Sequence, residues 1–169
     1  MNLMKAVTVF APHRYEVRDV PIPVPPKGWA LIRILTAAFC ATDLEVLRGG
    51  IPAAYPITPG HEWCGVVEEV GGEGAQWIGK RVAGSNDVCC LTCRACRSGL
   101  WRNCKDFGEI GFAHNGAYAQ FMLAPLYALR EMPEQISDIQ AAMLEPLGVA
   151  LGTLDKVDAR MGDTLLILG

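Results

Sequence analysis

The sequence predicts a mainly β fold, in the form of a partly open barrel, and three observations lead to this prediction. Short apolar segments of strand length recur through most of the chain, and each is bounded by glycines or prolines. Hydrophobic residues make up 51% of the 169 residues, which is enough to fold rather than stay disordered. A long helical pattern appears only from Ser137 onward. Short strands separated by frequent turns are typical of a β barrel.

The strands of this barrel can be assigned in chain order. The first two alternate as a hairpin, with Ala11–Arg14 as the turn, and the prolines that follow exclude regular structure before the buried strand Trp29–Ala38. One helical turn, Asp43–Leu47, ends at Gly49 and Gly50. The expected strands are residues 4–10, 15–20, 29–38, 66–70, 81–83 and 117–124.

The C-terminal part changes character, so we expect two domains, residues 1–136 and 137–169. Ser137 and Gln140 form a capping-box pattern, and apolar residues then recur at helical spacing. Pro146 removes one backbone hydrogen bond and is expected to push Glu145 away from helical geometry, toward a site. Thr164–Leu168 reads as a short buried strand.

The strongest chemical signal is a set of cysteines with the spacing C-x2-C-x2-C-x7-C, in a lobe that spans residues 89–105. Four thiolates around one centre match the tetrahedral geometry of a closed structural zinc site. Four basic residues and no carboxylate share this stretch, which suits the excess negative charge of such a site. The cysteines are Cys90, Cys93, Cys96 and Cys104, and the basic residues are Arg94, Arg97, Arg102 and Lys105.

A second group of metal-ligand types lies upstream, and it consists of Cys40, His61 and Glu62, with Glu145 further on. One thiolate, one imidazole and one carboxylate with a vacant fourth position are the pattern of a catalytic zinc. Each of these residues taken alone is more often a core or surface residue. The two groups together favour two zinc sites, one structural and one catalytic.

Four motifs, in order, now identify a family. They are Cys40–Asp43, the pattern Gly60-His61-Glu62-x2-Gly65-x5-Gly71, the four-cysteine lobe, and Leu144–Leu147 followed by Gly162–Gly169. The chain resembles the zinc-dependent medium-chain dehydrogenases, which include alcohol, sorbitol, threonine and glucose dehydrogenases. The resemblance covers the whole chain. It implies a GroES-like partly open barrel with a zinc lobe, followed by the first helix and strand of a Rossmann domain.

The resemblance also implies an activity, the transfer of hydride between a primary or secondary alcohol, polyol or sugar and NAD or NADP. Cys40, His61 and either Glu62 or Glu145 would bind the catalytic zinc, because a second carboxylate would leave a net negative charge that opposes alkoxide formation. Glu62 and Thr42 are the expected catalytic residues, and the Thr42 hydroxyl would hydrogen-bond the alkoxide. Asp43 either supports the metal site or caps the following helical turn.

The chain ends at Gly169, where family members begin their phosphate-binding glycine turn. We therefore expect a truncated protein that lacks cofactor-binding residues and has no dehydrogenase activity by itself. One alternative is a stand-alone zinc-binding domain with a structural or interaction role and no turnover. Another is a zinc-ribbon nucleic-acid module, which leaves His61, Glu62 and Glu145 unexplained.

Composition narrows the class of partner. The formal net charge of −3 argues against nucleic acid, and no apolar run is long enough to span a membrane. The N-terminal residues do not form a secretory signal, so the seven cysteines indicate metal binding in a reducing cytoplasm. Cys64 and Cys89 are expected to be core or loop residues. The expected partner is a small-molecule substrate, and the full-length protein is expected to be a homo-oligomer.

Overall fold

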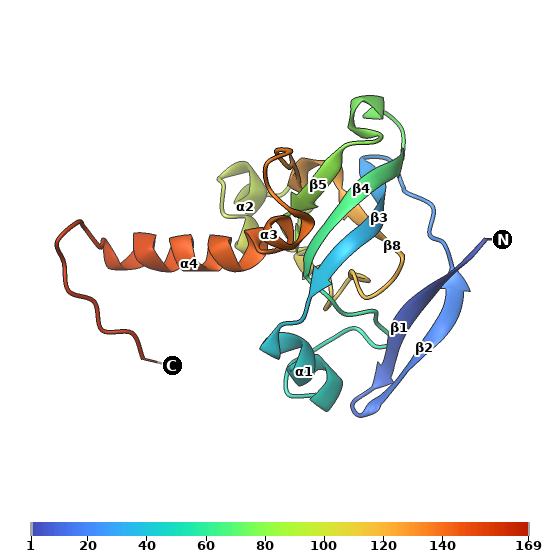
Figure 1. Ribbon diagram of the computed structural model, residues 1–169, viewed down its shortest axis with the longest axis horizontal. Coiled ribbons are helices and arrows are strands. Elements are labelled where there is room, and N and C mark those ends of the chain that lie inside the picture. Colours follow the sequence, from blue (N-terminus) through green and yellow to red (C-terminus); the bar gives the residue numbers. More distant parts are fainter. Residues whose placement is uncertain (1, 169) are drawn as a thin grey trace.

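The fold is organised around one five-stranded antiparallel sheet in the computed structural model, which describes residues 2–168 (Figure 1). The strand order is β8-β3-β4-β5-β9. The mainly β prediction is confirmed, and the sheet stays open rather than closing into a complete barrel. The strands are β3 (Trp29–Ala38), β4 (Glu62–Val70), β5 (Arg81–Gly84), β8 (Phe121–Pro125) and β9 (Leu129–Glu131).

The N-terminal hairpin forms a sheet of its own. Its strands are β1 (Leu3–Ala11) and β2 (Arg14–Pro21), as the alternating pattern predicted. Two isolated bridges, Ala6 with Ala119 and Val9 with Ile57, attach β1 to the body of the domain. The hairpin therefore closes one side of the molecule without joining the main sheet.

The main core lies against the five-stranded sheet. Its fully buried members include Ile32 on β3, Trp63 and Val67 on β4, and Met122 on β8. Burying a side chain of this size stabilises the fold by roughly 1.5–3 kcal/mol. Strands β3 and β4 pair along most of their length, from Ala30 with Val70 to Ala38 with Glu62, and the candidate site lies at the Ala38–Glu62 end.

Helix α1 (Ala41–Arg48) begins where β3 ends and carries one wall of the candidate site. Cys40 is its N-cap residue, and the Asp43 carboxylate accepts a hydrogen bond from the Cys40 backbone N–H at 3.0 Å. Gly49 ends the helix with a φ of 79°, a left-handed conformation that favours glycine. The helix is longer than the single turn expected from the sequence, although it ends at the expected glycines.

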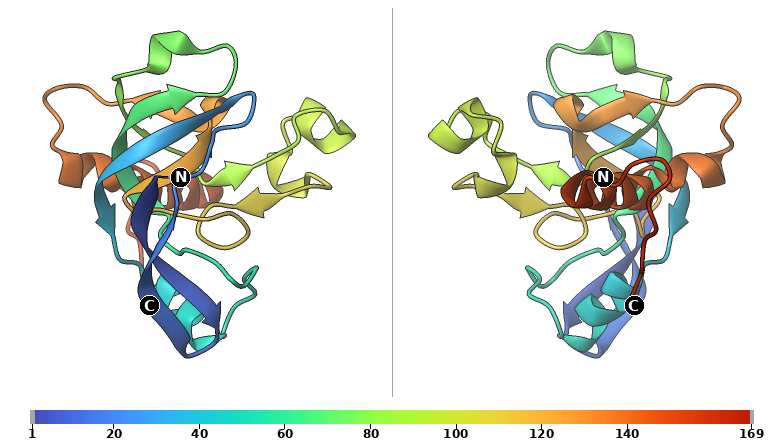
Figure 2. Two further views of the ribbon diagram at one scale, coloured as in Figure 1. Left: turned by 90° about the vertical axis from the view of Figure 1, so that its right-hand side faces the viewer. Right: turned by 90° about the vertical axis from the view of Figure 1, so that its left-hand side faces the viewer.

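The cysteine lobe extends to one side of the sheet (Figure 2). Its framework is a two-stranded sheet, β6 (Asp87–Val88) with β7 (Gly108–Glu109), and the short helices α2 (Arg94–Arg97) and η2 (Trp101–Asn103). None of these elements was predicted, because strands of two residues show no periodicity. The 3-10 turns η1 (Ala75–Trp77) and η3 (Leu126–Ala128) were not predicted either.

The C-terminal helices correct one expectation. Helix α3 (Asp138–Ala142) has the predicted capping box, and α4 (Leu144–Val157) follows after a break at Met143. Pro146 does not cause a break beside Glu145, since both residues lie in the first turn of α4. Proline is tolerated there because the first N–H groups of a helix have no intrahelical partner.

The last described residues correct a second expectation. Thr164–Leu168 do not form a strand, and Leu166, Ile167 and Leu168 are exposed. Figure 1 shows α4 and this segment leading away from the sheet, and within residues 2–168 no strand pairs with the segment. Gly169, expected as the first glycine of a cofactor turn, lies outside the described residues. Among residues 2–168, no helix combines the length and apolarity needed to cross a bilayer.

Candidate metal centres

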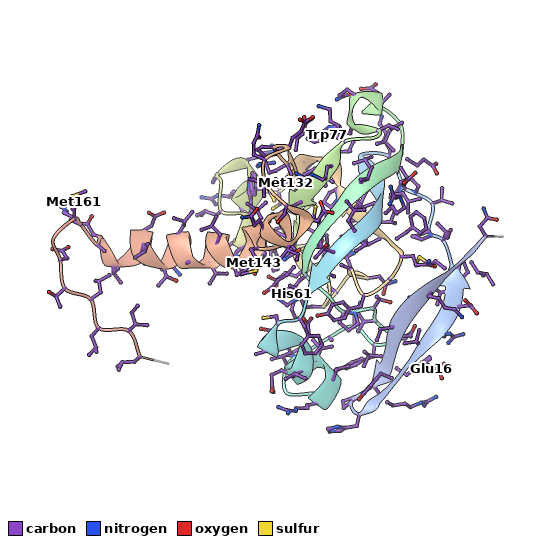
Figure 3. The ribbon with its side chains drawn as sticks, viewed as in Figure 1. Glu16, His61, Trp77, Met132, Met143 and Met161 are labelled. Atoms are coloured by element: carbon purple, nitrogen blue, oxygen red, sulfur yellow. The ribbon has the colours of Figure 1, made fainter. Side chains whose placement is uncertain are left out.

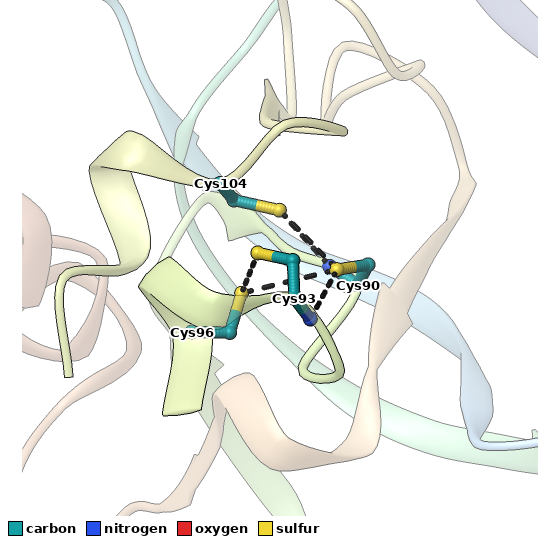
Figure 4. Close-up of side chains that lie close together, drawn as sticks. All are labelled: Cys90, Cys93, Cys96 and Cys104. Carbon is teal, nitrogen blue, oxygen red and sulfur yellow. Dashed lines mark hydrogen bonds between the residues drawn. The ribbon is translucent and has the colours of Figure 1, made fainter. Parts of the chain in front are cut away.

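The four lobe cysteines converge on one point (Figure 4). The Sγ–Sγ distances are 3.5 Å for Cys93 and Cys96, 3.6 Å for Cys104 and Cys90, and 4.0 Å for Cys90 and Cys96. A tetrahedral zinc with Zn–S bonds of about 2.3 Å places its sulfur atoms about 3.8 Å apart. The geometry of this cluster therefore fits a single zinc ion with an all-thiolate shell.

Backbone N–H groups point at these sulfur atoms. Cys93 N donates to Cys90 Sγ at 3.3 Å, and Cys90 N and Asp106 N each donate to Cys104 Sγ at 3.4 Å. Such donors favour the thiolate form, which is the form that binds metal. Hydrogen bonds from Thr92, first from its side chain and then from its backbone, lower the pKa of Cys90 to about 6.

The neighbouring thiols divide the negative charge unequally. Backbone N–H groups, with Cys96 first and Lys105 second, lower the pKa of Cys93. Burial and the other thiols raise the pKa of Cys96 to about 12. In the absence of metal, the pKa values favour the thiolate at Cys90 and Cys93 and the protonated thiol at Cys96. Binding of a divalent cation would displace the remaining thiol protons.

The expected role of Arg102 and Lys105 as counter-charges for the thiolates is not supported by their contacts. Arg102 pairs with Asp87 at 3.2 Å and with Glu109 at 3.4 Å, and Lys105 lies 3.6 Å from the Asp106 carboxylate. The donors that contact the sulfur atoms directly are the backbone N–H groups of Cys90, Cys93 and Asp106. These donors could not be predicted from the sequence, because every residue type except proline carries a backbone N–H.

The second group brings together Cys40, His61 and Glu62, whose ligand atoms all lie within 4.8 Å of one another. Strand register explains this convergence. Glu62, the first residue of β4, pairs with Ala38 at the end of β3, and Cys40 follows two residues later. His61 immediately precedes β4, and Figure 3 shows it beside α1 at the end of the sheet.

Asp43 lies behind this group and is 1% exposed. Its Oδ2 accepts hydrogen bonds from Cys40 N at 3.0 Å and from the Tyr118 hydroxyl at 2.6 Å, and its Oδ1 accepts one from Gly60 N at 3.3 Å. His61 Nδ1 lies 3.2 Å from the same Oδ1. Asp43 therefore makes both contacts that the sequence left as alternatives, since it caps α1 and also faces the histidine.

The buried His61 ring has a distinctive environment. Burial lowers its pKa, but the Asp43 carboxylate and then the Cys40 thiol outweigh that effect and raise the pKa to about 9. The Nδ1 atom is buried and lies 3.2 Å from Asp43 Oδ1, and it has no hydrogen-bond partner among the described residues. Because Nδ1 faces Asp43, the Nε2 atom is the nitrogen left to bind a metal.

A cleft of about 850 Å³ opens in front of His61. Thr42 lines it, and its Oγ1 lies 3.4 Å from Cys40 Sγ. Glu145 lines the same cleft from the first turn of α4, but it is not a member of the three-residue group. Burial raises the pKa of Glu145. The structure thus brings Cys40, His61 and Glu62 together and places Thr42 and Glu145 along the cleft beside them.

Comparisons with known proteins support the motif analysis. Residues 26–134 match the family model of the alcohol dehydrogenase GroES-like domain. The chain is 33% identical to L-threonine 3-dehydrogenase of Chromobacterium violaceum over 91% of this chain and 46% of the relative. The chain thus spans about half the length of the curated relatives it matches.

Solved structures agree with this result. A zinc-binding dehydrogenase from Sinorhizobium meliloti 1021 bound to NADP superposes with a TM-score of 0.84, at 31% identity over 92% of this chain and 46% of that one. An alcohol dehydrogenase (rspB) from Escherichia coli CFT073 complexed with NADH gives a TM-score of 0.90, at 27% identity over 97% of this chain and 48% of that one. The chain therefore belongs to the zinc-dependent medium-chain dehydrogenase family and carries its GroES-like domain.

Proposed function

We propose that this chain is the zinc-binding catalytic part of an oxidoreductase that transfers hydride between a small alcohol, polyol or sugar and NAD or NADP. The observation that carries the proposal is the meeting of Cys40, His61 and Glu62 at the wall of an open cleft. These residues supply three ligands and leave one side for a substrate oxygen. The cofactor is assigned because the matching solved structures hold NADP and NADH.

Charge supports the choice of ligands. One thiolate, one neutral imidazole and one carboxylate balance the two positive charges of zinc. When bound, zinc acts as a Lewis acid that lowers the pKa of a coordinated hydroxyl group. Glu62 is the favoured carboxylate, because its oxygen lies within 4.8 Å of the other donors. Glu145, which lines the cleft, is the alternative ligand.

Thr42 has the position of a proton-transfer residue. Its hydroxyl lies beside the Cys40 sulfur and faces the same cleft as His61. A hydroxyl here can accept the proton of a substrate alcohol bound in the cleft and pass it toward solvent. A positioned acid–base group of this kind contributes roughly 10²–10⁴-fold to a rate.

The lobe has a separate role in the proposal. Cys90, Cys93, Cys96 and Cys104 hold a structural zinc, because four thiolates leave no position for a substrate. Removing this metal would release the loop between β6 and β7. The complete protein is proposed to work in the cytoplasm as a homo-oligomer, on small molecules rather than nucleic acid.

Metal analysis of matched variants tests the proposal. The chain purified without chelator should contain up to two zinc ions, and His61→Ala should lose one of them while keeping the lobe zinc. Cys104→Ser should lose the lobe zinc and become prone to aggregation, because structural zinc contributes directly to folding. A His61→Ala protein that retains two zinc ions would contradict the proposed catalytic site.

An activity assay separates the enzyme from a zinc-binding domain without turnover. The full-length gene product should oxidise members of an alcohol, polyol and sugar panel with NAD or NADP, and Thr42→Val should reduce kcat roughly 10²–10⁴-fold. A full-length product that binds zinc and nucleotide but oxidises no alcohol would support the structural alternative.

A further inference from the structure

The hydroxyl group of Tyr118 lies behind the candidate catalytic centre and contacts both segments that lead to its ligands. It donates to Asp43 Oδ2 at 2.6 Å and lies 3.0 Å from the carbonyl oxygen of Ala38. Asp43 faces His61, and Ala38 ends the strand that leads to Cys40. The Tyr118 hydroxyl therefore connects Asp43, which faces His61, with the end of β3, which leads to Cys40.

The ring of Tyr118 is fixed between the same two segments. It stacks on Phe39, which directly precedes Cys40, with ring centroids 5.7 Å apart and an interplanar angle of 11°. It also covers Gly60, which directly precedes His61. A Cβ atom at Gly60 would lie 2.8 Å from Tyr118 Cδ1. These two contacts place the ring between the segments that precede Cys40 and His61, with its hydroxyl toward Asp43 and Ala38.

The hydrogen bonds of Asp43 show what this hydroxyl does. Oδ2 receives the Cys40 N–H and the Tyr118 O–H, while Oδ1 receives the Gly60 N–H and faces His61 Nδ1 at 3.2 Å. With Oδ2 occupied by two donors, the carboxylate cannot rotate without losing both. Oδ1 is thereby held toward the histidine, which leaves Nε2 to the metal.

We propose that Tyr118 is a positioning residue of the catalytic metal centre, which orients His61 through Asp43. The inference rests on the proposed function, since it concerns the same centre. A tyrosine that only satisfied its own hydrogen bond would affect stability and nothing else. A positioning tyrosine must also affect metal affinity and the ligand field, because the partners of ligating histidines typically change metal affinity 10–100-fold.

Tyr118→Phe tests the hydroxyl while it keeps the stacked ring. The matched control is Tyr55→Phe, which loses a hydroxyl bond at 2.5 Å to the carbonyl of Val46, a residue of α1, and leaves the hydrogen bonds of the Asp43 carboxylate in place. Both variants, with the wild-type chain, are titrated with Zn²⁺ and with Co²⁺ after removal of metal. The readouts are the dissociation constant of each site, the visible Co²⁺ spectrum and the Tm of the metal-free chain.

Tyr118→Phe should weaken the site of Cys40, His61 and Glu62 about 10-fold or more and shift its Co²⁺ bands, with the cysteine lobe unchanged. Tyr55→Phe should lower Tm by a similar amount and leave both sites as in the wild type. An unchanged affinity and spectrum in Tyr118→Phe would overturn the role of Tyr118 alone. A wild-type chain that binds metal only in the lobe would instead overturn the proposed function as well.

Discussion

Leu91 is the residue of the lobe whose backbone is most unusual. It has a φ of 58°, the left-handed region that a leucine rarely adopts, and its side chain is 43% exposed. Its backbone N–H is one of the groups that lower the pKa of Cys96. In this conformation the Leu91 N–H points toward the cysteine cluster. The strained backbone is therefore explained by the hydrogen bond that it provides to Cys96.

Leu91→Gly should therefore stabilise the zinc-loaded chain by about 1 kcal/mol, because a left-handed leucine costs roughly 1–2 kcal/mol and a half-exposed side chain loses little burial. Chemical denaturation of the zinc-loaded variant measures the change. His13, at the hairpin turn with a φ of 62°, provides the comparison through His13→Gly, which should gain a similar amount without altering zinc affinity. A loss of stability in both variants would contradict the strain argument.

The pKa of His61 predicts how the stability of the metal-free chain depends on pH. The folded pKa of about 9 lies above the ordinary value of 6.5, so the proton on His61 stabilises the fold below pH 6.5. This contribution should be lost as pH rises from about 6.5 to 9. Denaturation of the chelated chain across this range should show the loss, and His61→Gln should not show it.

The zinc affinity of the site formed by Cys40, His61 and Glu62 should depend on pH in the opposite direction from the stability of the metal-free chain. A ligating imidazole must be neutral, so binding displaces the His61 proton and the affinity should rise with pH up to about 9. Calorimetric titration in two buffers of different ionisation enthalpy counts the released protons, to which the Cys40 thiol and the His61 imidazolium can each contribute one. Release of none near pH 7.5 would show that His61 is already neutral in the metal-free chain.

The sequence predicts the proposed ligands but not the groups behind them. Cys40, His61 and Glu62 belong to types that bind metal, so their pattern could be recognised. Tyr118 and the backbone donors of the lobe carry no such signal, because a tyrosine in an apolar segment is ordinarily a core residue. Asp43 was recognised, although its two contacts with α1 and His61 had been treated as alternatives.

At the scale of elements, the close pairing of β3 and β4 builds the site. The bounds of β3 match the predicted strand, whereas β4 begins at Glu62, four residues before the expected Val66. The start of β4 was missed because polar residues such as Glu62 are not expected in a buried strand. His61 and Glu62 are nevertheless only 6% and 8% exposed. Burial of these side chains at a strand end is itself a sign of function.

Gly65 tests how closely these two strands must approach. A Cβ at this position would lie 2.5 Å from the carbonyl oxygen of Arg33 and 2.5 Å from Ile32 Cγ2, both on β3. Gly65→Ala should destabilise the chain by about 1–3 kcal/mol through overpacking, and should weaken zinc binding at the end of β4. Thermal unfolding and zinc titration measure both effects.

The control for this substitution is Gly148→Ala, on helix α4, where a Cβ would meet nothing within 4 Å. Alanine should be neutral there or stabilise the helix by up to about 1 kcal/mol. Equal effects of the two alanines would show that close strand approach is not what requires glycine at position 65.

At the scale of the molecule, the main sheet and the convergence of the lobe cysteines were predictable, whereas the short elements of the lobe and the conformation of residues 164–168 were not. Apolar alternation and turn residues are local signals, so the mainly β fold follows from them. Thr164–Leu168 has the composition of a strand, yet a strand needs a neighbour to satisfy its backbone groups. Residues 2–168 provide none beside it, and Leu165–Leu168 are exposed accordingly.

The two proposed zinc ions should differ in the affinity with which the chain binds them. The lobe metal would have four thiolate ligands and no open side, whereas the other centre faces an open cleft. A dilute chelator should therefore remove the metal of Cys40, His61 and Glu62 first and leave one zinc per chain. Removal of the lobe zinc before the cleft zinc would contradict this order.

The most direct test of the account is anomalous diffraction at the zinc absorption edge, from crystals of the chain purified without chelator. We expect two peaks, one among Cys90, Cys93, Cys96 and Cys104, and one within bonding distance of Cys40 Sγ and a nitrogen of His61, with Zn–S and Zn–N bonds of about 2.3 and 2.0 Å. A crystal with zinc in the lobe, and with Cys40 and His61 turned away from each other around an empty centre, would contradict the central claim.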